Sequence, residues 1–398
     1  VSLREIRRNE GTGEWISVSG ADPLHVTPPS WRSDLVGIAE LVEEVARFTG
    51  YDNVPAILPV AREGNGLTPR QRLRRKVSKS LAYGGMVEVL NYPFIGPADH
   101  DALLIPADDW RRVAVRLMNP LSAEQPEMRT SLLAPLLAAA QRNAGRGQRD
   151  LAIYEMGLVT LPSVSGVPAG TPGLSQRPTD VELAQIDAAI PQQFESVAGV
   201  LAGQRLRGGA FTAGRAVSWA DAIALARGIG ATAGVELQVR PAEKAPWHPG
   251  RCAALLLHDD VIGYAGELHP KVAENFGLPR GSAAFELRLE ALYGAERGAV
   301  VATAVRTFPV ALQDLAFITP NSVAVARMQA ALASALGDVC ESVRCFDVYS
   351  GDPVPEGHRS LAFALRLRAA DRTLSEAEVT EYRERAVAAG TALGGILR

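Results

Sequence analysis

The clearest hydrophobic pattern lies near the C-terminus, in the segment RSLAFALRLR at 359–368. Apolar side chains recur there with a period of two, which is typical of a β-strand with one buried face. The buried positions are Leu361, Phe363, Leu365 and Leu367. The alternate positions are small except for Arg366 and Arg368. The pattern therefore predicts a sheet with one covered face and one open, locally positive face.

The segments around this strand complete a regular order of elements. Strands are predicted at 314–319, 339–349 and 359–368 and over the last residues, 392–398, with helices at 323–336 and 375–389. Asn321 or Ser322 is the expected cap of the first helix, and Ser375 with Glu378 forms a capping box for the second. The order β-α-β-β-α-β predicts a ferredoxin-like domain.

A second pattern lies between residues 28 and 55 and predicts an amphipathic helix. Its apolar stripe has the spacing of a buried helical face and consists of Ile38, Leu41, Val45 and Phe48. Three glutamates lie on the other side and one aspartate lies just upstream; the four acids are Asp34, Glu40, Glu43 and Glu44. A cluster of oxygen ligands alone suits Mg²⁺ better than Zn²⁺. The spacing equally allows a solvated acidic face, on which Glu43 and Arg47 form an ordinary i, i+4 pair.

The overall composition limits the number of domains, the mode of RNA binding and the cellular compartment that can be expected. With 398 residues and 47% hydrophobic content, the chain is expected to fold as a globular protein of two or three domains. We place these at 1–66, 67–304 and 305–398. The net charge of −3 argues against general electrostatic adhesion to nucleic acid, so RNA binding would need a local patch. Three unpaired-looking cysteines, the lack of a long apolar run and the lack of a secretory signal predict a cytoplasmic protein without membrane contact.

The middle region shows no catalytic motif. It contains no phosphate-binding loop, nucleophile elbow or zinc-protease signature. The basic run between Arg70 and Lys79 reads more simply as a solvated helix face than as an RNA site. His248 and Cys252 flank a Pro-Gly turn without further metal-ligand spacing, which favours a structural role. We therefore predict no catalytic residue in this chain.

The acidic segment reads PSWRSD, LVEEVAR and GYDNVP, and it resembles the metal-site module of the bacterial phenylalanyl-tRNA synthetase beta subunit. The resemblance implies a Mg²⁺ shared with the alpha subunit and held by Asp34, Glu40, Glu43 and Glu44. The family typically has Asp at the position of Glu40, so direct ligation by that residue stays open.

The last region resembles the ferredoxin-fold anticodon-binding domain that ends the same subunit, through TFPVALQDLAF, CFDVYSG, RSLAFALRLRAADRTLSEAEV and LGGILR. This implies tRNA binding, because an exposed sheet face with arginines and an aromatic ring suits unstacked bases. The candidate residues are Tyr349, Arg359, Arg366, Arg368 and Arg372. Arg366 and Arg368 could equally only solubilise the sheet or pair with acids. Gln313 replaces the Arg of many relatives, so no contact is carried over to it.

The middle region resembles the class II synthetase-like domain of that subunit, through MNPLSAEQPEMRTSLLAPLLAAAQRN, LAIYEMG, WHPGR and GELHP. In the family this domain is non-catalytic, and LAIYEMG accordingly keeps Glu155 without the Arg that would hold an ATP phosphate. The expected fold class is therefore α+β: a small metal-site module truncated at its N-terminus, a class II-like non-catalytic domain and a ferredoxin-like anticodon-binding domain.

Taken together, the resemblance implies a beta-subunit part of phenylalanine-tRNA ligase. Its partners would be an alpha subunit that binds ATP, in an alpha2-beta2 heterotetramer, and tRNA(Phe). The family's N-terminal tRNA-binding and editing domains would precede Val1. Two alternatives remain: a stand-alone RNA-binding or scaffold protein derived from this fold, and a metal-dependent hydrolase using Asp34 and the glutamates. The second lacks an accompanying general base or phosphate cradle.

Overall fold

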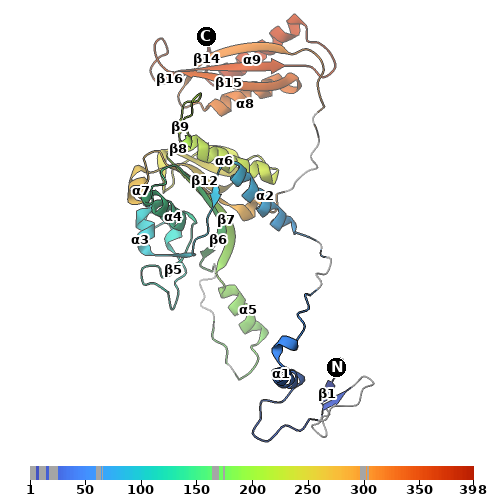
Figure 1. Cartoon of the computed structure of the whole chain (residues 1–398). Helices are drawn as coiled ribbons and strands as arrows, with labels where there is room; N and C mark the ends of the chain where they lie inside the picture. The colour runs from blue at the N-terminus through green and yellow to red at the C-terminus, as the bar shows by residue number, and fades with distance from the viewer. Residues whose placement is uncertain are drawn as a thin grey trace. The chain divides into compact units, whose positions relative to one another are not determined.

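The computed structural model describes residues 6–8, 15–17, 26–59, 64, 66–163, 170–173, 175–295, 302 and 304–398. The chain divides into two compact units, 1–295 and 296–398, whose elements are labelled in Figure 1. None of the helices in the described ranges has the length and apolar content needed to cross a membrane.

The first unit begins with a small module. Two short strands, β1 (Ile6–Arg8) and β2 (Trp15–Ser17), pair antiparallel and are followed by helix α1 (Ile38–Thr49) and the 3₁₀ turn η1 (Tyr51–Asn53). The helix lies where its apolar spacing predicts. The prediction that this stripe is buried is wrong for the described residues, because no residue of α1 is buried. Val45 is 60% exposed and Phe48 is 82% exposed, since no described segment packs against them.

The body of the first unit is a seven-stranded sheet. Its strands, in spatial order, are β10 (Gln238–Pro241), β11 (Trp247–Leu257), β12 (Asp260–Leu268), β13 (Ala283–Arg288), β7 (Gln192–Ala202), β6 (Leu151–Leu161) and β3 (Val87–Glu88). All neighbours pair antiparallel except β3 and β6. Three two-residue strands and one three-residue strand form two further ribbons, β4 (Phe94–Ile95) with β5 (Glu127–Met128) and β8 (Gln204–Leu206) with β9 (Arg215–Ala216).

Helices cover both faces of this sheet. The helices of the body are α2 (Pro69–Tyr83), α3 (Pro97–Ala102), α4 (Leu133–Gly145), α5 (Asp180–Ala189), α6 (Trp219–Ala233) and α7 (Pro270–Asn275), with the 3₁₀ turns η2 (Trp110–Arg112) and η3 (Leu289–Leu292). Of these, α5 has no buried residue and belongs to neither core cluster of the sheet. One core cluster joins the sheet to α4 and α7, and a second joins it to α2 and α6 (Figure 1). Successive side chains of β13 point to opposite faces of the sheet, so Ala284 belongs to the first cluster and Phe285 to the second. The predicted helix start at Thr68 and Pro69 is confirmed, with Thr68 and Gln71 forming a capping box.

The second unit has the predicted ferredoxin-like order. Its elements are β14 (Ala311–Pro320), α8 (Val325–Leu336), η4 (Gly337–Val339), β15 (Cys340–Tyr349), β16 (His358–Leu367), α9 (Glu376–Ala392) and β17 (Ile396–Leu397). The sheet order is β15-β16-β14-β17. The predicted inward residues of β16 are confirmed: all four are at most 1% exposed and pack with α8 and α9. The face of this sheet that turns away from α8 and α9 is called the open face below.

The two helix starts of this unit and the end of β16 are each fixed by specific hydrogen bonds. The capping box of Ser375 and Glu378 is confirmed, whereas the predicted cap of α8 is wrong, because Ala324 holds that position without a side-chain bond. The reason is that the Asn321 amide donates to the Gly357 carbonyl and a turn intervenes before the helix starts. The end of β16 is also tied to the chain that precedes β14, since Arg306 and Arg368 each donate to the other's carbonyl.

Candidate functional site

The acidic residues around α1 are organised by an arginine. The Arg32 guanidinium donates to Asp34 at 2.9 and 2.7 Å and to Glu44 Oε1 at 2.5 Å. Arg47 donates to the other oxygen of Glu44. These hydrogen bonds, with those from Arg32 the largest, hold the pKa values of the Asp34 and Glu44 carboxyls below their usual range. Two of the predicted metal ligands, Asp34 and Glu44, are thus brought together by the Arg32 guanidinium, which binds both.

The other two predicted ligands lie apart from this pair. Glu43 accepts a hydrogen bond from the Tyr51 hydroxyl. Glu40 turns back toward the start of the helix, where its Oε2 is buried without a hydrogen-bond partner. That oxygen lies so close to Gly37 that a Cβ there would be 2.6 Å away, and a larger residue would displace the Glu40 carboxylate from this position.

Two observations bear on whether Mg²⁺ fits these residues. The donor set is entirely carboxylate, and one buried oxygen lacks a partner, which suits a hard cation. Against this, no three His, Cys, Asp or Glu side chains of the described ranges are grouped so as to hold a metal ion. The chemistry of the donors therefore fits Mg²⁺, while the arrangement gives the cation's place between Asp34 and Glu44 to Arg32. The metal ligands stay a prediction.

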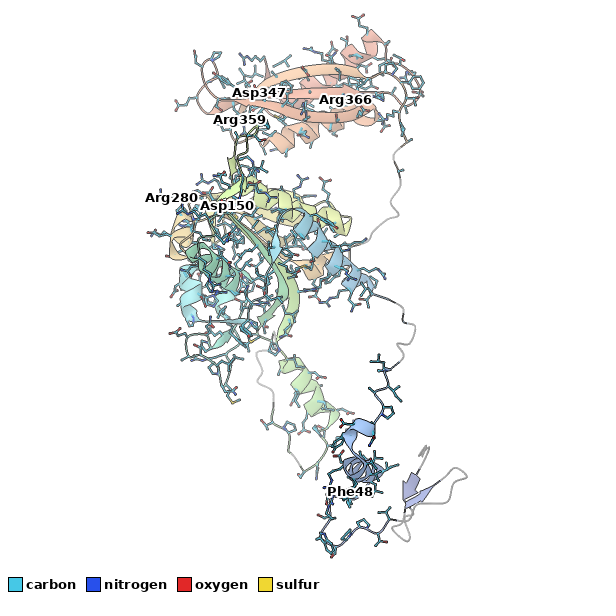
Figure 2. All side chains as sticks on the ribbon, in the orientation of Figure 1. Phe48, Asp150, Arg280, Asp347, Arg359 and Arg366 are labelled. Carbon is cyan, nitrogen blue, oxygen red and sulfur yellow. The ribbon has the colours of Figure 1, made fainter. Side chains whose placement is uncertain are left out.

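The candidate RNA-binding residues of the second unit divide into two sets. Arg366 and Tyr349 lie on the open face, opposite Leu312 and Ser360 respectively, and Figure 2 marks Arg366 with Asp347 on this sheet. Arg366 is 45% exposed in its side chain and donates to Glu341 at 2.9 Å. Arg368 also pairs with Glu341, at 3.4 Å, but only 19% of its side chain is exposed.

The remaining two candidates do not join that face. Arg359 has the strand parity of the buried residues, and its guanidinium donates to the Val323 carbonyl at 2.8 Å. Arg372 pairs with Asp371 at 3.0 Å and with Glu378 at 2.8 Å, beyond the end of the strand. Of the five candidates, only Arg366 and Arg368 are brought together, at Glu341. Tyr349 pairs with Ser360 and Arg366 with Ser342, so these two lie toward opposite ends of β16.

The open face is mixed in charge, which corrects the expectation of a locally positive surface. Glu341 neutralises the two arginines, and Asp314 and Asp347 lie opposite Ala364 and Ala362 on the same face. These acids come from β14 and β15, which the alternation within β16 alone does not reveal.

In the body, the signature glutamate of LAIYEMG forms a buried ion pair. Glu155 accepts from Arg129 at 2.6 Å and from the Asn91 amide at 2.7 Å, and both charged side chains are at most 5% exposed. Arg129 also donates to the Leu158 carbonyl. The guanidinium beside Glu155 is therefore paired inside the protein and is not presented to a phosphate.

Two further residues singled out in the sequence are accounted for structurally. The His248 ring accepts a hydrogen bond from the Gly250 amide at 3.0 Å, within the turn. Burial raises the pKa of the Cys252 thiol to about 11, so no reactive thiolate forms near neutral pH.

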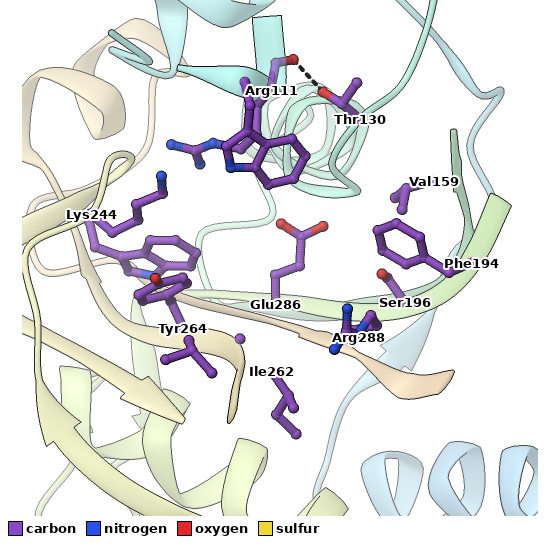
Figure 3. Close-up of a pocket in the computed structure, with 14 residues that line it drawn as sticks. Arg111, Thr130, Val159, Phe194, Ser196, Lys244, Ile262, Tyr264, Glu286 and Arg288 are labelled. Atoms are coloured by element: carbon purple, nitrogen blue, oxygen red, sulfur yellow. Dashed lines mark hydrogen bonds between the residues drawn. The ribbon is translucent and has the colours of Figure 1, made fainter. Parts of the chain in front are cut away.

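A cavity of about 180 Å³ lies on the α4 side of the seven-stranded sheet (Figure 3). We call it the sheet cavity. Four aromatic rings contribute to its wall: Trp110, Phe194, Trp247 and Tyr264. Glu286, on β13, projects into its centre. No motif of the sequence identifies this residue as a site, although an acid inside the apolar segment AAFELRL is a signal of a specific environment.

Hydrogen bonds and burial set the pKa values of two carboxyl groups at or next to the cavity, Glu286 and Asp109. Glu286 accepts from the Leu132 amide and the Ser131 hydroxyl, each at 2.7 Å, at the start of α4. Burial raises its pKa, and these two hydrogen bonds oppose the rise. Arg111 and Lys244 both bind Asp109, whose pKa is held well below its usual range, chiefly by Arg111.

Three family comparisons cover most of the chain in order. Residues 11–51 match the tRNA synthetase B5 domain, residues 54–289 the phenylalanyl tRNA synthetase beta chain CLM domain, and residues 307–398 the ferredoxin-fold anticodon binding domain. The chain belongs to the phenylalanyl-tRNA synthetase beta chain family. The resemblance predicted from the sequence is confirmed, as is the α+β class with these three domains.

Individual relatives agree. The chain is 50% identical over 390 residues to the phenylalanine–tRNA ligase beta subunit of Thermobifida fusca (strain YX), covering 96% of this chain and 46% of that protein. It is 47% identical over 398 residues to the same subunit of Streptomyces avermitilis, covering 99% and 48%. The chain thus spans about half the length of the curated relatives it matches. A pyrrolysyl tRNA synthetase structure from Desulfitobacterium hafniense is 13% identical over 64% of this chain and 72% of that one, with a TM-score of 0.38, too slight a likeness to build on.

Proposed function

We propose that this chain supports the ATP-dependent attachment of phenylalanine to tRNA(Phe) as a beta-subunit part, without catalysing it. The observation that carries the proposal is the match, in order, to three domains of the beta chain. It is supported by 50% sequence identity to a curated beta subunit. The buried Arg129–Glu155 pair supports the non-catalytic role, because a guanidinium enclosed by protein cannot stabilise charge on a transferring phosphate.

The proposed division of labour assigns chemistry to an alpha subunit. That subunit would bind ATP and phenylalanine, in an alpha2-beta2 assembly. The exposed apolar side of α1, with Val45 and Phe48, is consistent with a protein that functions in an assembly.

The open face of the second unit is the proposed tRNA contact. Its central residues are small, Ala362 and Ala364, and Tyr349 and Arg366 stand beside them. A base could stack on the ring and a phosphate could displace Glu341 from Arg366. Arg368 would act next to Arg366. Arg359 and Arg372, which lie off this face, would at most contact the flanking backbone.

For Mg²⁺, the proposed ligands are Asp34, Glu43 and Glu44, with Glu40 direct or through water. Bound there, the ion would neutralise the acids and stiffen the module. Arg32 would have to release Asp34 and Glu44 first. Replacing Glu43 and Glu44 by Gln should weaken Mg²⁺ binding in a calorimetric titration; an unchanged titration would remove these residues from the ligand set.

The deciding experiment is co-purification with an alpha subunit from a close relative such as Thermobifida fusca, followed by a phenylalanine-charging assay. We expect a stable complex, charging that depends on both chains, and no aminoacyl-adenylate from this chain alone. Adenylate formation by the isolated chain would contradict the proposal.

The second candidate, a stand-alone RNA-binding or scaffold protein, is favoured only by the self-contained fold of the second unit. It predicts RNA binding without affinity for any alpha subunit, so the same co-purification separates the two.

A further inference from the structure

The sheet cavity contains polar groups whose bonding capacity is not used. Ser196 is 3% exposed and lines the cavity, yet within the described ranges its hydroxyl has no hydrogen-bond partner. Arg288, also at the wall, forms no ion pair with the described residues. The Ser196 hydroxyl and the exposed Arg288 guanidinium are therefore free to bind a molecule in the cavity.

The charges of the cavity are of both signs. Asp109, which does not line the cavity, neutralises the charges of Arg111 and Lys244 through three side-chain hydrogen bonds. Glu286 keeps free lone pairs after accepting its two hydrogen bonds. Glu286 and Arg288 therefore remain as the uncommitted negative and positive groups, and Figure 3 places Ser196 near both.

The size and walls of the cavity restrict the occupant further. A dry cavity of about 150 Å³ is enough for benzene, and this one has about 180 Å³. The Trp247 and Tyr264 rings, with centroids 5.7 Å apart, form one side, and Phe194 forms another. The walls therefore suit a compact apolar group of about one ring.

We propose that the sheet cavity binds a small zwitterion: a molecule with a protonated amine and a carboxylate on a compact apolar body. The amine donates to Glu286, the carboxylate accepts from Arg288 and the Ser196 hydroxyl, and the body packs among the aromatic rings. The proposal concerns binding alone and involves no bond-making step. It goes beyond the proposed function and is tested on the chain without any partner.

The test is a titration of the 398-residue chain with three probes that share one body. L-phenylalanine carries both charges, phenethylamine only the amine, and 3-phenylpropionate only the carboxylate. Binding is followed by calorimetry and by the fluorescence of Trp110 and Trp247. We expect L-phenylalanine to bind about tenfold more tightly than either analogue, since each lost charged contact weakens binding by about that factor.

Two substitutions assign the charges, with a matched control. Arg288→Gln should weaken L-phenylalanine about tenfold and leave phenethylamine nearly unchanged. Ser196→Ala should weaken L-phenylalanine severalfold. Arg280→Gln, an equal change of charge at an exposed position that does not line the cavity, should change nothing. Because neither Arg288 nor Ser196 makes a described side-chain hydrogen bond, both variants are expected to fold, which thermal unfolding checks.

Several results would overturn the proposal. Absence of saturable binding by all three probes would do so, as would equal affinity for L-phenylalanine and 3-phenylpropionate. The same conclusion would follow if Arg288→Gln and Arg280→Gln affected L-phenylalanine equally. None of these results bears on complex formation with an alpha subunit, so the two proposals fail separately.

Discussion

The seven-stranded sheet of the first unit and the four-stranded sheet of the second differ in how many faces are covered. The first is packed with helices on both sides, and its polar groups are drawn into internal pairs such as Arg129–Glu155. The second is covered on one side, and its arginines and acids remain at the surface. A buried charge must be paired inside the protein, whereas an exposed charge can exchange its partner for a ligand at little cost. The two sheets thus separate structural support from contact surface.

The largest expected effect tests the internal pairing of the first sheet. Arg129→Met should lower the free energy of unfolding by about 3–5 kcal/mol, because it leaves Glu155 buried without its cation. Denaturant unfolding followed by tryptophan fluorescence measures this, since all five tryptophans precede residue 248 and the signal reports only on the first unit.

A second substitution and a control sharpen this measurement. Adding Glu155→Leu to Arg129→Met should recover part of the loss, because the uncompensated charge is then gone. The control, Glu341→Gln, breaks the exposed pairs of the second unit and should cost at most about 1 kcal/mol there, measured by hydrogen exchange because that unit has no tryptophan. Equal costs for Arg129→Met and Glu341→Gln, each measured in its own unit, would abolish the contrast between the sheets.

The next prediction compares the two faces of the second sheet. Phe363→Ala should cost about 3–5 kcal/mol, because this ring is fully buried under α8 and α9. Leu312→Ala, on the open face and 63% exposed, should change stability by about 0.5 kcal/mol or less. Hydrogen exchange of the β16 peptide reports both. A large loss of protection in the Leu312 variant would mean that the open face is covered after all.

A smaller effect is expected on tRNA affinity. Arg366→Ala with Arg368→Ala should weaken tRNA binding by the assembled enzyme about tenfold and lower the salt dependence by about one to two charges. Binding measured over a salt series tests this. Arg383→Ala with Arg385→Ala makes the same change of charge on α9, which packs on the covered face, and serves as the control. Unchanged affinity at every salt concentration would contradict the assignment of the open face to tRNA.

The smallest predicted effect concerns pH. Backbone and side-chain hydrogen bonds within the capping box, with that from Arg372, lower the pKa of Glu378 to about 2. A carboxyl whose pKa is lower in the folded state stabilises the protein above its ordinary pKa of 4.5 and loses that contribution as the pH falls toward 2. The stability difference between the wild type and Glu378→Gln should therefore shrink between pH 5 and pH 2.5, as followed by circular dichroism.

Glu384→Gln is the matched control for this prediction, since Glu384 is exposed on the same helix and makes no hydrogen bond with the described residues. Its difference from the wild type should depend little on pH. A difference for Glu378→Gln that stays constant over the same range would show that the capping box does not titrate as described.

The sequence predicted those features that depend on neighbouring residues. Alternation in β16 identified the covered face, and Ser375 with Glu378 identified the start of α9, because strand period and capping are local. The cap of α8 was misplaced, since a backbone hydrogen bond to distant Gly357 decides where that helix begins.

Features that depend on contacts between distant segments were not predicted, because no local pattern of residues records them. The acids facing Arg366 come from two other strands, and the partner of Glu155 comes from the segment before α4. The sheet cavity gathers residues from β7, β11, β12, β13 and η2, which no local pattern joins. The apolar stripe of α1 was predicted correctly, but no described segment packs against it.

The reciprocal bonds of Arg306 and Arg368 have a mechanical consequence. They fasten the incoming chain to the end of β16, the strand that pairs with both β14 and β15. Tension arriving along the polypeptide at Arg306 is therefore delivered to an inner strand, where many hydrogen bonds resist shear together, and not to an edge that could peel one bond at a time.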